Sequence, residues 1–178
     1  NNRIDKNCNP DTVLEEATRR KMSPKMLCAF KDGTKTMVEM TAMSNATGLV
    51  PDVIGGHGIA SDVKSLNETY KLKEDGGILK QHGVVEYVNG IAPGVFVTVA
   101  TDNEEIAYQM QYHSMGPGPL WTLYRPYHLC NLEAPLTAAK VVIDGEPTIV
   151  PKNGRVSECI TVAKIDLKAG QTIDGIGG

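Results

Sequence analysis

The strongest constraint on the fold is a change in hydrophobic period along the chain. Residues 12–22 and 24–47 place apolar side chains at helical spacing, whereas residues 84–88 (VVEYV) and 95–99 (VFVTV) have the composition of strands. The residues between these regions are rich in turns, with glycine pairs at 55–56 and 76–77. A chain with helices first and strands later is typical of the α+β class.

The signals for the start and end of the second helix are clear. Ser23 suits an N-cap, Pro24 suits the first helical position, and Gly48 suits a left-handed C-cap. The pattern predicts one continuous helix over residues 24–47. We expect this helix to form a hairpin with the first, packed on a small mixed sheet that contains residues 84–88 and 95–99.

The second half of the chain contains both helical and strand patterns. The pattern predicts further helices at residues 103–112 and 132–143, the second despite Pro135, and further strands. The additional strands are expected at residues 121–124, at residues 158–164, and from residue 172 onward. The last third of the chain is therefore predicted to be rich in strands.

Charge and composition exclude several classes of protein. The chain has 178 residues, a net charge of −3 and no basic block, which argues against nucleic-acid binding. No stretch approaches the apolar length of a membrane span, and the first residues lack the apolar region of a signal peptide. The four cysteines are scattered, without zinc-site or disulfide-scaffold spacing. We expect reduced thiols in a cytoplasmic protein.

The first candidate site lies in the predicted second helix. In a continuous helix Asp32, Lys35 and Glu39 share one face, because their spacing is i, i+3 and i+7. A lysine held between two carboxylates can polarise a carbonyl oxygen or move a proton. The alternative is a solvated ladder of ion pairs. Gly33 in an otherwise good helix costs about 1 kcal/mol and is easier to explain if a ligand or another backbone comes close.

The second candidate site is the segment of residues 124–129 (YRPYHL). Arg125 can bind a carboxylate or phosphate with two hydrogen bonds, and His128 can exchange a proton near neutral pH. Glu133 follows closely enough to orient either side chain. The alternative is a packed Tyr/Pro corner with an exposed arginine. The glycine-rich residues 55–58 lack the spacing of a phosphate-binding loop, so phosphate binding is not expected there.

Several sequence runs together resemble a known family. The chain is similar to the part that follows the cofactor domain in homoserine-dehydrogenase-like oxidoreductases with a C-terminal SAF (β-clip-like) region. The nearest branch includes the deoxyxylulose-phosphate reductoisomerase-like enzymes of bacterial isoprenoid biosynthesis. The runs that carry the resemblance are residues 9–13 (NPDTV), 32–35 (DGTK), 45–49 (NATGL), 123–129 (LYRPYHL), 145–148 (GEPT) and 163–170 (AKIDLKAG).

The resemblance implies a fold, a cofactor and roles for the candidate residues. It implies a substrate-binding and catalytic domain over residues 1–133 and a truncated SAF-like β region over residues 134–178. A Rossmann domain that binds NAD(P) is expected to precede residue 1 and to be absent from this chain. With the resemblance added, Lys35 is expected to be catalytic, with Asp32 and Glu39 setting its charge and position. Arg125 and His128 are expected to bind substrate.

The expected function follows from the resemblance and the candidate residues. The chain is expected to act on the carbonyl or secondary alcohol of a small anionic substrate, such as a phosphorylated sugar, with NAD(P) bound mainly by the missing domain. Alone, it is expected to be inactive and to associate with itself, most simply as a homodimer. We expect no metal, nucleic acid or membrane partner. The alternative is a non-catalytic SAF-type sugar-binding or assembly module.

Overall fold

The computed structural model describes residues 4–91, 93–128, 130–173 and 175 of the chain. It combines helices with short strands, so the predicted α+β class is confirmed. The chain divides into two compact units, which are described separately. The first unit contains Asn1–His57, Val85–Tyr87 and Ile149–Gly178, and the second contains Gly58–Val84 and Val88–Thr148. The domain boundary predicted between residues 133 and 134 falls inside one helix, and that boundary stays a prediction.

Three helices open the first unit, and the start of the second and the end of the third follow the sequence signals. They are α1 (Leu14–Arg20), α2 (Pro24–Lys31) and α3 (Thr34–Thr47). Ser23 precedes α2, and Pro24 occupies its first position. At the far end Gly48 adopts the left-handed conformation with φ 82°, and its N–H donates to the carbonyl of Ser44. The predicted start and end of the 24–47 helical region are therefore confirmed.

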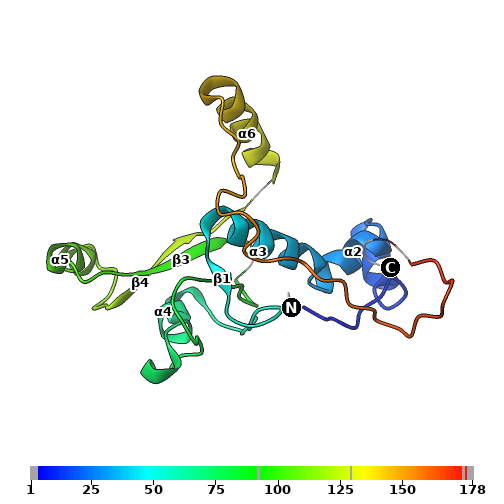
Figure 1. Cartoon of the computed structure of the whole chain (residues 1–178), viewed down its shortest axis with the longest axis horizontal. Coiled ribbons are helices and arrows are strands. Elements are labelled where there is room, and N and C mark those ends of the chain that lie inside the picture. The colour runs from blue at the N-terminus through cyan, green and yellow to red at the C-terminus, as the bar shows by residue number, and fades with distance from the viewer. Residues whose placement is uncertain (1–3, 92, 129, 174, 176–178) are drawn as a thin grey trace. The chain divides into compact units, whose positions relative to one another are not determined.

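The predicted continuous helix is wrong at Asp32 and Gly33. The N–H of Asp32 still donates to the carbonyl of Cys28, but Gly33 has φ 91°, which ends α2. The carboxylate of Asp32 then accepts the N–H of Thr34 at 2.8 Å and satisfies a free donor at the start of α3. Figure 1 shows α2 and α3 as separate coils. Gly33 is thus a junction between two helices and carries no helix-interior penalty.

A cluster of buried side chains from the helices and the loop before them forms the core of the first unit. Met22 packs against this cluster, and none of its described members belongs to a strand. The predicted packing of a helical hairpin on a sheet is therefore not found in this core. Among the described residues, β1 (Val50–Pro51) is the only strand wholly inside this unit's ranges; it is two residues long and pairs with β2 (Val84–Val85). The buried members of the cluster are Cys8, Val13, Ala17, Leu27 and Cys28.

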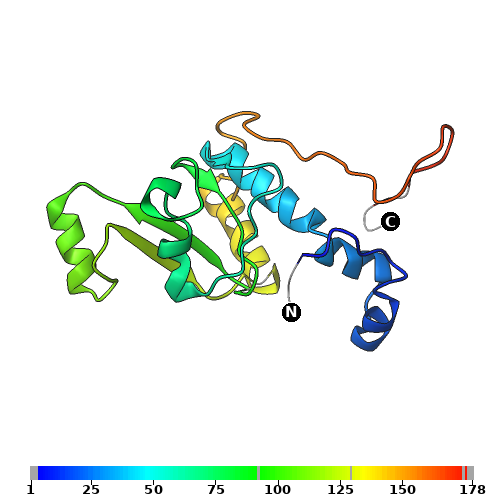
Figure 2. The same cartoon turned by 90° about the horizontal axis from the view of Figure 1, so that it is seen from below.

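The second unit is built on an antiparallel pair of six-residue strands, β3 (Val95–Ala100) and β4 (Leu120–Arg125). Helix α5 (Glu104–Tyr112) lies in the connection between the two strands (Figure 2). Both strands were predicted, but the prediction that β3 shares a sheet with residues 84–88 is wrong. Strand β4 matches β3 over its full length, with Thr98 opposite Thr122, and leaves β2 to pair with β1.

One face of the β3–β4 pair covers a small core. Helix α4 (Leu66–Thr69) follows the 3₁₀ turn η1 (Val63–Ser65), and a second 3₁₀ turn, η2 (Lys73–Asp75), lies just beyond. Leu66 is fully buried, and the ring of Tyr70 lies 5.8 Å from that of Phe96 on β3. This cluster anchors β3 to the helical turns of its own unit.

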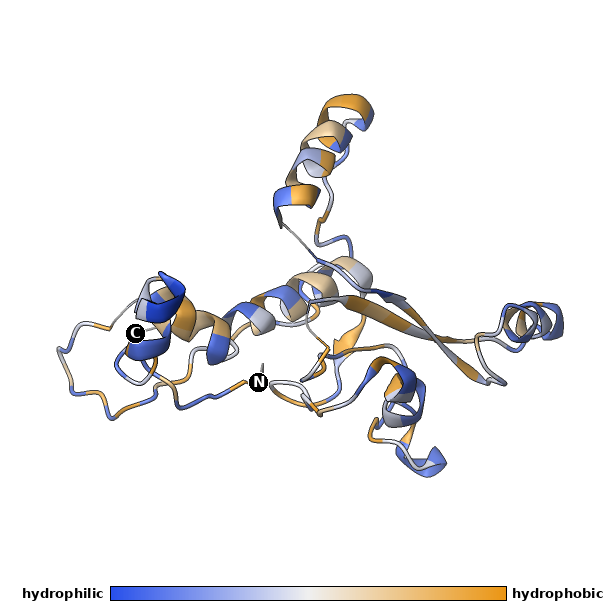
Figure 3. Ribbon diagram, turned by 180° about the vertical axis from the view of Figure 1, so that it is seen from behind, coloured by the Kyte–Doolittle hydropathy of each residue, from blue (hydrophilic) through white to orange (hydrophobic). Residues whose placement is uncertain are grey.

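Helix α6 (Cys130–Asp144) confirms the helix predicted across Pro135. Figure 3 shows many apolar residues along it. Several of these residues are exposed in the isolated chain, with Leu136 at 66% and Val142 at 84% exposure. The helix therefore presents an unusual amount of apolar surface for its length.

The strands predicted at residues 158–164 and from residue 172 are wrong within the described residues 145–173 and 175, which contain no strand. The chain just before the predicted strand is held by α3 instead of by a neighbouring strand. The side-chain oxygen of Asn45 accepts the N–H groups of Val156 and Ser157, and Asn153 donates to the carbonyl of Ala46. These contacts hold residues 153–157 at the end of α3, and no described strand lies alongside residues 158–164.

None of the helices among the described residues has the length and apolar character that crossing a bilayer requires.

Candidate functional site

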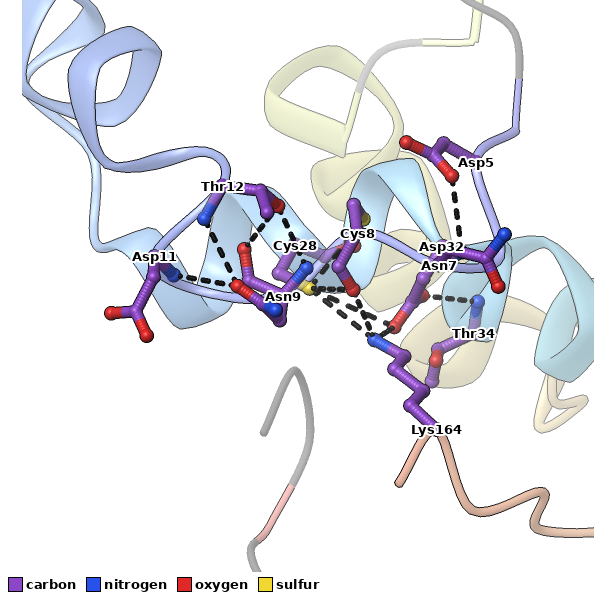
Figure 4. A network of polar contacts seen from close by, with 10 residues as sticks. All are labelled: Asp5, Asn7, Cys8, Asn9, Asp11, Thr12, Cys28, Asp32, Thr34 and Lys164. Carbon is purple, nitrogen blue, oxygen red and sulfur yellow. Dashed lines mark hydrogen bonds and ion pairs between the residues drawn. The ribbon is translucent and has the colours of Figure 1, made fainter. Parts of the chain in front are cut away.

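A polar cluster forms in the first unit around the ammonium group of Lys164. The Nζ of Lys164 lies 2.8 Å from Oδ2 of Asp32, donates to the carbonyl of Cys8 at 2.7 Å, and lies 3.4 Å from Sγ of Cys28. Figure 4 shows the lysine reaching from the C-terminal segment to these three residues. The cluster thus joins the loop before α1, the end of α2 and residue 164.

Local structure explains why these groups meet. Cys28 and Asp32 stand one helical turn apart at the end of α2, and Cys8 is brought there by its loop. The N–H of Asp5 donates to the carbonyl of Lys31, and the N–H of Cys8 donates back to the carbonyl of Asp5. The two sulfur atoms of Cys8 and Cys28 lie 3.6 Å apart as free thiols. Their side chains are buried in the core described above.

The electrostatics of the cluster favour the charged pair. Burial alone would raise the pKa of Asp32, but hydrogen bonds from Lys164 and Thr34 outweigh it and hold that pKa below its ordinary value of 3.8. Burial likewise lowers the pKa of Lys164, while its bonds to Asp32 and Cys28 raise that pKa above 10.5. Burial raises the pKa of the Cys8 thiol to about 11. At neutral pH the cluster is therefore an ion pair of Asp32 and Lys164 beside the neutral thiol of Cys8.

The predicted arrangement of Asp32, Lys35 and Glu39 on one helix face is wrong, because the helix ends before Asp32. Lys35 and Glu39 remain together on α3, one turn apart, and both are exposed. Within the described chain Lys35 forms no ion pair with either carboxylate, and its Nζ lies 4.5 Å from the centre of the Phe30 ring. Asp32 is instead committed to Lys164. The catalytic role of Lys35 stays a prediction.

The structure does bring Arg125, His128 and Glu133 together in the second unit. The guanidinium of Arg125 lies 2.5 Å from Oε1 of Glu133, and Nδ1 of His128 lies 3.0 Å from the other oxygen. Arg125 also lies over the ring of Tyr127 at 4.7 Å. Glu133 is less exposed than either partner, so one carboxylate on α6 orients both side chains. Leu129 of the same motif lies outside the described residues.

Sequence analysis missed a histidine site in the first unit. The ring Nε2 of His57 lies 2.6 Å from Oδ2 of Asp52, whose side chain is fully buried, and the backbone N–H of His57 donates to Glu86. Two carboxylates therefore lie beside the glycine-rich loop. The spacing of Asp52 and His57 across a turn was the only sequence signal for the pair.

Lys164 and the cysteine pair were missed for a different reason. Lys164 is 132 residues from Asp32 in the sequence. The residues around it predicted a strand and contributed to the family resemblance, but neither gave the lysine a role. No local pattern indicates such a contact. Within the described residues no group of three or more His, Cys, Asp or Glu side chains is placed to hold a metal ion.

Comparison with known proteins adds one finding. Residues 1–134 match the family model described as "Oxidoreductase DRL, catalytic domain". The matched range includes Lys35, Arg125, His128 and Glu133, whereas Lys164 lies beyond it. No curated protein matches the chain.

Proposed function

Because the chain belongs to the family of oxidoreductase DRL catalytic domains, we propose that it is the substrate-binding and catalytic portion of an NAD(P)-dependent oxidoreductase. Its substrate would be the carbonyl or secondary alcohol of a small anionic molecule, such as a phosphorylated sugar. The observation that carries this proposal is the state of Lys35, an exposed ammonium group on α3 without a carboxylate partner in the described chain. The proposal includes the homoserine-dehydrogenase-like relationship and a cytoplasmic location.

Lys35 supplies the electrostatic part of the chemistry. It lies in the first turn of α3, so the helix fixes its backbone while its side chain rests on the Phe30 ring. Since no carboxylate pairs with it in the described part of the chain, the ammonium can donate to a carbonyl oxygen as negative charge develops there. Glu39 lies one turn along the same helix and is also exposed. Asp32 positions Lys35 only indirectly, because its carboxylate fixes the start of α3.

Arg125 and His128 supply recognition of an anionic group. Glu133 contacts one end of the Arg125 guanidinium, and the remaining N–H donors of that group can bind a phosphate or carboxylate. His128 shares the same carboxylate and offers its imidazole nitrogens as further hydrogen-bonding groups. Both side chains are about half exposed, so a ligand can reach them.

The described residues do not suit a bound dinucleotide. None of them forms a strand, glycine-rich turn and long helix in succession, and the one glycine-rich loop, at residues 55–58, has Asp52 and Glu86 beside it. We therefore assign NAD(P) binding to a Rossmann domain outside this chain. A nicotinamide bound there would supply or accept the hydride.

The surface of α6 supports self-association as part of the proposal. Leu136 and Val142 are exposed apolar residues on this helix, and a second copy would remove such area from water. The alternative function, an SAF-type sugar-binding module, has no comparable support because the described residues after Arg125 contain no strand.

The proposed function is tested by following NAD(P)H absorbance with the full-length protein that contains this chain. Small phosphorylated ketoses and aldehydes form the test panel, with their uncharged analogues as controls. We expect oxidation of NAD(P)H with at least one phosphorylated carbonyl compound and much weaker activity with its uncharged analogue. A folded protein that oxidises NAD(P)H with none of these compounds contradicts the proposal.

A further inference from the structure

The buried thiols of Cys8 and Cys28 are the feature that the proposed function leaves unused. Their sulfur atoms lie 3.6 Å apart, and the residues are separated by 20 positions in the sequence. A disulfide requires about 2.05 Å between sulfur atoms, so each sulfur has to move by less than about 1 Å. We propose that Cys8 and Cys28 are a disulfide-forming pair that closes reversibly when the chain meets a small-molecule disulfide such as oxidised glutathione.

The surrounding hydrogen bonds permit closure without leaving a buried acceptor unpaired. In the thiol form Cys28 donates to the carbonyl of Cys8, and Cys8 donates to the carbonyl of Cys28. Closure removes both S–H donors. The carbonyl of Cys8 keeps the ammonium of Lys164 at 2.7 Å, and the carbonyl of Cys28 keeps the N–H of Asp32 at 2.8 Å. Both carbonyl oxygens therefore keep a hydrogen-bond donor when the disulfide forms.

The two cysteines have different surroundings. Burial raises the pKa of Cys8 to about 11, which keeps its sulfur as a thiol, whereas the sulfur of Cys28 lies 3.4 Å from the Lys164 ammonium and 4.0 Å from Oδ2 of Asp32. Both residues are buried, so glutathione reaches either sulfur only when this core opens locally. The exposed Cys159 contacts the Thr41 hydroxyl and has no described sulfur beside it.

The exchange balances in atoms and electrons. One of the two cysteine sulfurs displaces one glutathione thiolate and forms a mixed disulfide. The other cysteine sulfur then attacks that cysteine's sulfur, displaces the second glutathione, and forms the bond between the two cysteines. The two protein thiols are oxidised, glutathione disulfide is reduced, and the two thiol protons end on two glutathione molecules. The product links the loop before α1 to α2 within the same core.

The test uses the 178-residue chain with Cys130→Ser and Cys159→Ser, which leaves Cys8 and Cys28 as its only two thiols. The chain is equilibrated with reduced and oxidised glutathione, in buffer and in urea that unfolds it, and quenched with acid. Mass spectrometry then measures the fraction in which a peptide pair is joined through Cys8 and Cys28. We expect the equilibrium constant for closure to be at least about tenfold larger in the folded chain, because folding holds the sulfurs together.

Two results overturn the proposal. One is an equilibrium constant in the folded chain equal to or below that in urea, since native packing then opposes closure. The other is a folded chain that accumulates only glutathione adducts without the Cys8–Cys28 link. Circular dichroism before and after oxidation establishes that the folded sample is folded in both states. Cys8→Ser on the same background is the matched control, because it cannot form the link and can carry glutathione only at Cys28.

Discussion

The ammonium of Lys164 lies 2.8 Å from the carboxylate of Asp32, although the two residues are 132 positions apart. The side chain of Asp32 is only 4% exposed, so this carboxylate depends on its partners for its charge. One oxygen accepts the N–H of Thr34 at the start of α3, and the other accepts Lys164. Asp32 therefore lies at the end of α2, satisfies a donor at the start of α3 and holds the C-terminal segment.

Replacing Lys164 by Met should lower the free energy of unfolding by about 1–3 kcal/mol, because it leaves the buried Asp32 charge without its cation. Urea unfolding followed by circular dichroism measures the change. Lys168→Met is the matched control, since Lys168 is exposed and no ion pair of its ammonium is found in the described chain. Its effect should stay within about 0.5 kcal/mol. Equal effects for the two variants contradict the structural role of Lys164.

The Asp32–Lys164 pair also predicts how this stability difference varies with pH. The pKa of Asp32 is lowered on folding, so its contribution is present above about pH 3.8 and is lost as pH falls through the lower folded value. The pKa of Lys164 is raised, so its contribution is present below about pH 10.5 and is lost as pH rises through the higher folded value.

Unfolding of the wild-type chain and the Lys164→Met variant across the pH range measures this dependence. The difference between them should be flat between about pH 4 and 10 and shrink at both extremes. If the two chains have equal stability near neutral pH, the predicted contribution of the Asp32–Lys164 ion pair is wrong.

Gly33→Ala should destabilise the chain by more than about 1 kcal/mol. At φ 91° a Cβ is strained, and it would also lie 3.1 Å from Cγ2 of Ile4. Gly154→Ala is the control, because Gly154 has φ 72° but open space around its missing Cβ. Thermal unfolding of both variants separates strain from contact, and we expect the larger loss at Gly33. If Gly33→Ala leaves the stability unchanged, the left-handed junction at Gly33 is wrong and a continuous helix is favoured.

The sequence was sufficient where local patterns decide the structure. Pro24 and Gly48 marked the ends of the helical region, and the strand at β3 followed from alternating β-branched residues. It was insufficient at Gly33, where an interior glycine and a junction glycine have the same local pattern until the backbone conformation is known. The C-terminal segment failed because residues 158–164 have strand composition, yet Asn45 uses the backbone just before them.

The candidate sites show the same division. Arg125, His128 and Glu133 are near one another in sequence, so their contact could be expected from spacing alone. The contact between Asp32 and Lys164 depends on the return of a distant segment, which no local pattern encodes. Sequence analysis therefore placed Asp32 with Lys35, its neighbour along the chain, and missed its ion-pair partner.

Arg125→Ala in the full-length protein should mainly raise the Michaelis constant for the phosphorylated substrate, by about tenfold or more, with a smaller change in turnover. The reason is that a clamp on a non-reacting anionic group stabilises the bound substrate and the transition state alike. Steady-state kinetics separates the two constants. Glu133→Gln tests the orientation of the guanidinium and should give a smaller change in the same direction. An unchanged Michaelis constant in both variants removes Arg125 from substrate binding.

Lys35→Met in the full-length protein is the sharpest test of catalysis on α3. Methionine keeps the helix propensity and most of the side-chain volume but removes the charge. If Lys35 stabilises developing charge on the substrate oxygen, turnover should fall by roughly 10²–10⁴-fold while stability changes by less than about 0.5 kcal/mol. Lys152→Met, at another exposed lysine of the same unit, should leave turnover unchanged. Near-normal turnover in the Lys35 variant shows that the exposed ammonium only covers the Phe30 ring.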